Sequence, residues 1–93
     1  MTSDPLFRMT IADIFFIKGR GIVATGRIEG GTLKVGDAIQ VARSGRAARA
    51  VTVTGIEKFH QIQTEARAGD DVGVLLRGVE KNDLQRGDVL LGG

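Results

Sequence analysis

The chain has 93 residues, with 13 lysines and arginines against 11 acidic residues, one histidine and no cysteine. This length is typical of one domain. Without cysteine there are no disulfide bonds or thiolate metal sites, and one histidine excludes a multi-histidine metal centre, so we expect no metal and a cytoplasmic protein. No apolar run approaches the roughly 18 residues of a transmembrane helix, so we expect no membrane partner.

The apolar residues come in short runs, each typical of a β-strand. From Phe7 to Ile17 the alternation changes phase, which predicts a bulge near Ala12–Asp13. From Ile22 to Ile28, Val23, Thr25 and Arg27 face away from Ile22, Ala24 and Ile28. Four further strands are predicted around Ile39 and Val41, from Val51 to Phe59, from Val72 to Leu76, and from Val89 to Leu91.

Six short strands with turn signals between them predict an all-β sandwich or barrel. We favour a closed barrel, because closure removes the exposed edges of such apolar strands. The one segment with helical character is Val79–Gln85.

One corner pattern occurs three times, as "KVGD" at 34–37, "RAGD" at 67–70 and "QRGD" at 85–88, each before a strand. Glycine adopts positive φ without steric cost, and aspartate accepts hydrogen bonds from nearby amides. We expect three similar turns.

The glycines of "GRGIVATG", at positions 19, 21 and 26, match neither a P-loop nor the Gly-x-Gly-x-x-Gly spacing. Ile22 to Thr25 is a strand-like run, so no helix N-terminus is available for phosphate. We expect a hairpin with Arg20 at its tip, and a close approach of another strand or a ligand at Gly26.

The segments "GRGIVATGRIEGGTLKVGD", "VTVTGIEKFHQ" and "EARAGDDVGVLLRGVEKNDLQRGDVL" closely resemble the second domain of translational GTPases, above all elongation factor Tu. The resemblance covers about Phe7 to Leu91. It implies a six-stranded closed antiparallel β-barrel at 7–91, with a leader at 1–6 and a tail at 92–93. The family's phosphate loop and catalytic residues are absent from this sequence, so we expect no enzyme or GTPase activity and no cofactor.

The resemblance also implies a pocket for the terminal adenine of aminoacyl-tRNA. Its residues are Ile17, Val23, Glu57, Leu75, Phe59, His60 and Asp71. Apolar side chains would hold the flat base while a carboxylate reads its edge. The alternative is that the aliphatic residues belong to the barrel and Glu57 is a solvated strand-end charge.

Two of these positions depart from the family pattern. His60 stands where the family usually has arginine, and Asp71 where it usually has asparagine. A histidine does not carry arginine's permanent charge, and an added carboxylate repels phosphate. We expect these two residues to weaken the affinity for a polyanion or to alter which ligand fits.

Four arginines are candidate contacts to the RNA backbone, Arg20 in one hairpin and Arg43, Arg46 and Arg49 in another. The resemblance favours tRNA or ribosomal RNA as partner, together with the GTPase domain of a translation factor. The alternative for the 43–49 hairpin is a solubilising surface.

Two functions remain open, and they belong to different classes. The chain is either a non-catalytic module that contacts RNA in translation, or a repurposed barrel that binds a protein partner or forms a homodimer. An enzyme built on Glu57, His60 and Asp71 would lack a nucleophile at interpretable spacing.

Overall fold

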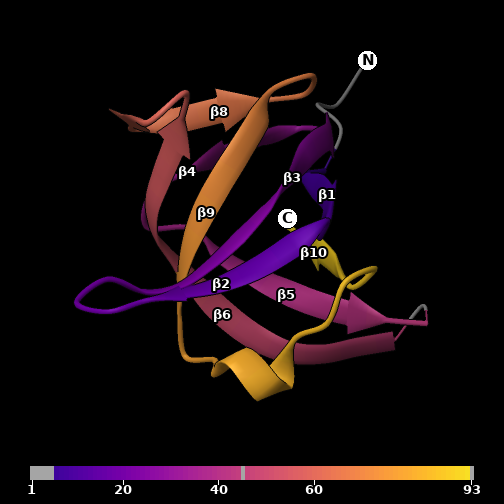
Figure 1. The fold of residues 1–93 in the computed structure, drawn as a ribbon. Helices are drawn as coiled ribbons and strands as arrows, with labels where there is room; N and C mark the ends of the chain where they lie inside the picture. Colours follow the sequence, from indigo (N-terminus) through magenta and orange to yellow (C-terminus); the bar gives the residue numbers. More distant parts are fainter. Residues whose placement is uncertain (1–5, 45, 93) are drawn as a thin grey trace, which may run out of the picture.

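The computed structural model describes residues 6–44 and 46–92 of the chain, so residues 1–5 of the expected leader and Gly93 of the expected tail lie outside it. Within the described residues the backbone forms short strands and one 3₁₀ helix (Figure 1). The elements are β1 (Arg8–Thr10), β2 (Asp13–Ile17), β3 (Gly21–Gly30), β4 (Thr32–Lys34), β5 (Ala38–Arg43), β6 (Arg46–Lys58), β7 (Gln61–Gln63), β8 (Glu65–Arg67), β9 (Asp71–Arg77), the helix η1 (Lys81–Asp83) and β10 (Val89–Leu91). None of the helical structure in this part of the chain is long enough to cross a membrane.

Six of the strands close into an antiparallel barrel, as predicted. Their order is β1-β10-β5-β6-β9-β3, and β3 pairs back onto β1. β2 extends this sheet beyond β3, β7 pairs with β6, and β4 pairs with β8 in a separate ribbon. The hairpin formed by β2 and β3 projects beyond the barrel wall in Figure 1.

The first predicted strand is divided into β1 and β2 at Ile11–Ala12, next to the expected bulge. The division follows from a change of partner. The Ile11 N–H donates to the Asp88 carbonyl, whereas the Ala12 N–H donates to the Thr25 carbonyl. The chain thus leaves the C-terminal segment and continues along β3 alone.

The barrel core contains the side chains that the alternation in β3 pointed inward. Ile22, Ala24 and Ile28 are buried in it together with residues of every other barrel strand. At Gly26 an added Cβ would collide with the carbonyl oxygen of Thr10, so glycine permits the close approach of β1 to β3. This is the close approach that the sequence predicted.

The three predicted corners share one geometry. Gly36, Gly69 and Gly87 all have positive φ, between 92° and 98°. The aspartate that follows each glycine accepts a hydrogen bond from the backbone N–H three residues before it, at 2.9–3.0 Å. An aspartate side chain therefore closes each of the three turns, which lead into β5, β9 and β10.

Candidate functional site

An open groove with a volume of about 760 Å³ crosses the outer face of the sheet. It runs over β2, β3, β9 and β6 and ends at the turn after β6. Its lining residues are Ala12, Phe15, Ile17, Val23, Thr25, Gly26, Arg27, Glu57, Phe59, His60, Asp71, Val72 and Gly73.

The strand register explains how residues distant in sequence meet in the groove. Phe15 pairs with Val23 across β2 and β3, and Gly73 lies between Thr25 of β3 and Glu57 of β6. Paired residues point to the same face of a sheet, so these side chains share the outer wall. The missing side chain of Gly73 deepens the groove at this point, because an added Cβ would lie 3.2 Å from Cγ1 of Val23.

Glu57 is held at the rim of the groove by Arg20 from the tip of the β2–β3 hairpin. The Arg20 guanidinium donates to Oε2 of Glu57, whose side chain is half-buried. Within the described residues, Oε1 of Glu57 receives no hydrogen bond. A carboxylate can accept at both oxygens, so Oε1 is available to a ligand's donor.

The turn between β6 and β7 holds Phe59 and His60 in an unusual backbone conformation. Both residues have positive φ, 53° and 64°, and Lys58 pairs with Gln61 across the two-residue loop. Turns of this kind normally use asparagine and glycine, because other side chains are strained at positive φ. The strained turn leaves the Phe59 ring 80% exposed beside the groove.

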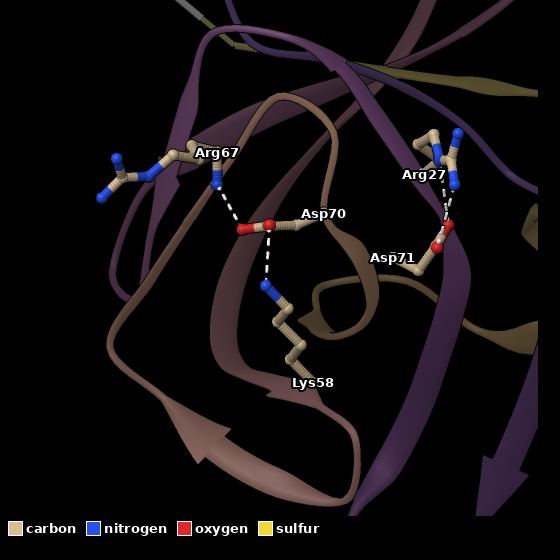
Figure 2. A network of polar contacts seen from close by, with 5 residues as sticks. All are labelled: Arg27, Lys58, Arg67, Asp70 and Asp71. Carbon is tan, nitrogen blue, oxygen red and sulfur yellow. Dashed lines mark hydrogen bonds and ion pairs between the residues drawn. The ribbon is translucent and has the colours of Figure 1, made fainter.

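Asp70 and Asp71 engage different partners (Figure 2). Asp71 binds the guanidinium of Arg27 at 3.2 and 3.3 Å and forms one wall of the groove. Asp70 accepts from Lys58 at 2.8 Å and from the Arg67 N–H at 3.0 Å. The Lys58 hydrogen bond, aided by the backbone one, lowers the pKa of Asp70, and Asp71 raises the pKa of Arg27.

The structure brings six of the seven predicted pocket residues into one groove; Leu75 is the exception. Leu75 pairs with Val23 on the same face but is buried against Gly55 and does not line the groove. Sequence reasoning missed Phe15, Thr25, Arg27 and Gly73. Their alternation was visible, but their place in the groove depends on a register that one sequence does not give.

The four arginines that we expected to contact the RNA backbone differ in whether acidic side chains of the protein already bind them. Arg43 forms two hydrogen bonds of 2.9 Å with Asp88, which is almost fully buried, and Arg49 contacts Asp83 at 3.4 Å. Arg20 is held by Glu57. Arg46 is exposed at the end of the same β5–β6 hairpin. Arg43 therefore has a structural role, whether or not it also meets RNA.

Residues 21–91 match the family model described as Elongation factor Tu domain 2. The chain belongs to this family. The matched range includes β3, β6, the turn after β6 and β9, which carry most of the groove of this domain 2 barrel, whereas Phe15 and Ile17 precede it. In the described residues of this domain 2, no group of three or more histidine, cysteine or acidic side chains could hold a metal ion.

Proposed function

We propose that this domain 2 barrel is a non-catalytic RNA-binding module whose groove holds the 3′-terminal adenosine of an aminoacyl-tRNA acceptor end. The observation that carries the proposal is the gathering of Ile17, Val23, Glu57, Phe59, His60 and Asp71 in one groove of a translation-factor barrel. Barrel strands supply the floor, and the strained β6–β7 turn supplies the rim.

The groove offers the two kinds of contact that a nucleobase requires. Phe15 and Phe59 present exposed aromatic rings on either side, and Ile17 and Val23 supply an aliphatic floor. Stacking on such a ring contributes about 1–3 kcal/mol per base. Oε1 of Glu57 accepts a hydrogen bond from the exocyclic amine of adenine. A cytosine stacked at the same position would place its exocyclic amine elsewhere.

Two arginine–carboxylate ion pairs set the charge that the groove presents to a ligand. Arg20 and Arg27 are bound to Glu57 and Asp71, so the groove carries both signs of charge. A ligand that lies there gains base contacts more than phosphate contacts. We therefore assign recognition to the base and only a weak, salt-dependent contribution to the backbone.

The test is a titration of an acceptor-stem RNA minihelix that ends in 3′-adenosine, against the same helix ending in 3′-cytidine, in its uncharged and aminoacylated forms. Glu57→Ala is expected to weaken binding of the adenosine form about tenfold, because a charge-assisted hydrogen bond is lost. Glu65→Ala is the matched control, because Glu65 is an exposed carboxylate on β8, outside the groove.

Equal affinity for the 3′-adenosine and 3′-cytidine minihelices, or an unchanged affinity in Glu57→Ala, would refute the proposal that the groove binds the terminal adenosine. Circular dichroism of each variant separates a lost contact from a lost fold. Replacing Arg43, Arg46 and Arg49 together would be a poor probe of RNA binding by the basic hairpin, because removing Arg43 leaves the Asp88 carboxylate buried and without its partner. Arg46→Ala alone probes the basic hairpin.

A further inference from the structure

Arg20 is predicted from the sequence to contact the RNA backbone, but its surroundings give it a different role. It stands at the tip of the β2–β3 hairpin, where its backbone N–H donates to the Ile17 carbonyl at 2.9 Å and closes a tight turn. Its guanidinium donates to Oε2 of Glu57 on β6. Glu57 lines the groove and Arg20 does not. Arg20 therefore acts on a ligand in the groove through Glu57.

The backbone of Glu57 is fixed by the sheet, whereas its carboxylate depends on Arg20. Glu57 pairs with Ile62 of β7 on one side and with Gly73 of β9 on the other. Within residues 6–44 and 46–92, the Arg20 guanidinium is the one donor to the Glu57 carboxylate. A glutamate side chain without a partner samples many rotamers, and the entropy lost when it is ordered opposes ligand binding.

The position of the ion pair suits it to hold both sides of the groove. β9 lies between β3 and β6 in the sheet, so the pair reaches across β9 and ties the hairpin to β6. The side chains of Arg20 and Glu57 are 41% and 25% exposed, against 67% and 65% for Arg27 and Asp71. Water competes less with a partly covered pair, so the geometry of Arg20 and Glu57 is held more firmly.

We propose that Arg20 is a positioning residue, which holds Glu57 through Oε2, leaves Oε1 to the ligand and so makes the groove selective for a base with an amine at its edge. The inference rests on the proposed binding of adenosine in the groove and adds how the base is selected. Because Oε2 is already bound, Oε1 alone accepts a hydrogen bond from the ligand. Without Arg20 the carboxylate is disordered and hydrated before the base arrives.

The test compares an acceptor-stem RNA minihelix that ends in 3′-adenosine with one that ends in 3′-purine riboside, which lacks only the exocyclic amine. The preference is the ratio of the two affinities. The wild type is expected to prefer the adenosine helix, and Arg20→Ala to lower this preference about fivefold, because the carboxylate is no longer ordered. The matched control is Arg8→Ala. Arg8 binds Glu29 at 2.8 Å and neither residue lines the groove, so the preference should not change.

The salt dependence of binding separates positioning from a phosphate contact. If Arg20 bound a phosphate, Arg20→Ala would weaken both helices equally and lower the slope of log affinity against log salt by about 1. Loss of positioning instead leaves this slope and the affinity for the purine riboside helix nearly unchanged.

Two further variants separate positioning from a merely structural role. In a Glu57→Ala background, adding Arg20→Ala should lower the preference no further, because both residues act through one contact. Arg20→Lys keeps a donor and the charge and should restore part of the preference. Arg20 is half-exposed at a hairpin tip outside the core, so we expect each variant to fold, and circular dichroism checks this.

The outcomes distinguish this inference from the proposed function. A wild-type preference that Arg20→Ala preserves would overturn the role of Arg20 and leave the adenosine groove standing. An equal loss of affinity for both helices, or an equal fall in preference in Arg8→Ala, would overturn it as well. A wild type that binds the two helices equally would refute the reading of the amine by Glu57, and the role of Arg20 with it.

Discussion

Asp88 shows at the residue scale how a charge can be buried inside an otherwise apolar barrel. Its carboxylate accepts two hydrogen bonds from Arg43 at 2.9 Å and one from the Gln85 N–H at 3.0 Å. The Arg43 hydrogen bonds lower the pKa of Asp88, although burial opposes them. The pair joins β5 to the corner before β10 and so helps to close the barrel.

The lowered pKa of Asp88 predicts a pH-dependent contribution to stability. Because the folded pKa lies below the unfolded value of about 3.9, the contribution is complete well above pH 4 and is lost as the pH falls through the folded pKa. Asp88→Asn should therefore lower the free energy of unfolding by about 1–3 kcal/mol at pH 7. The deficit should shrink as the pH falls below 4.

Urea unfolding at pH 7 and pH 3 measures this deficit. The control is Asp71→Asn, which removes the same charge from an exposed pair with Arg27 and should change stability little. An Asp88→Asn protein as stable as the wild type at pH 7, or a deficit that is the same at both pH values, would refute a stabilising role for the pair.

At the scale of the elements, the sequence predicted the six barrel strands, the position of the helical turn and the three glycine corners. These features come from alternation and from glycine, which act locally. The strands β4, β7 and β8 were missed, because each has three residues of which only one is apolar, whereas the equally short β10 consists of three apolar residues. The β6–β7 turn was missed because Phe59 and His60 carry no turn signal.

That turn supports a prediction in which stability and binding change in opposite directions. Replacing Phe59-His60 by Asn-Gly relieves two positive-φ side chains and should stabilise the fold by up to about 1 kcal/mol. The same change removes an aromatic ring from the groove rim and should weaken binding of the adenosine helix. Thermal unfolding and the RNA titration measure the two effects. A less stable protein, or one that binds RNA as before, would contradict the assignment.

At the scale of the whole molecule, ion pairs neutralise much of the basic character that the composition suggests. Within residues 6–44 and 46–92 there are seven lysine–acid or arginine–acid pairs, several of them between residues distant in sequence, such as Arg20–Glu57 and Arg43–Asp88. Arginines counted from the sequence therefore overstate the positive field available to RNA. The groove is therefore a better candidate for RNA binding on this barrel than the basic hairpin at 43–49.

The most direct measurement is a ¹⁵N-labelled amide NMR titration of the full chain with the minihelix that ends in 3′-adenosine. If the groove is the binding site, the largest shifts will come from Phe15, Val23, Glu57, His60 and Gly73, and the 3′-cytidine helix will cause smaller ones. Shifts confined to the 43–49 hairpin, or no shifts at low salt, would contradict a base-binding groove on this barrel.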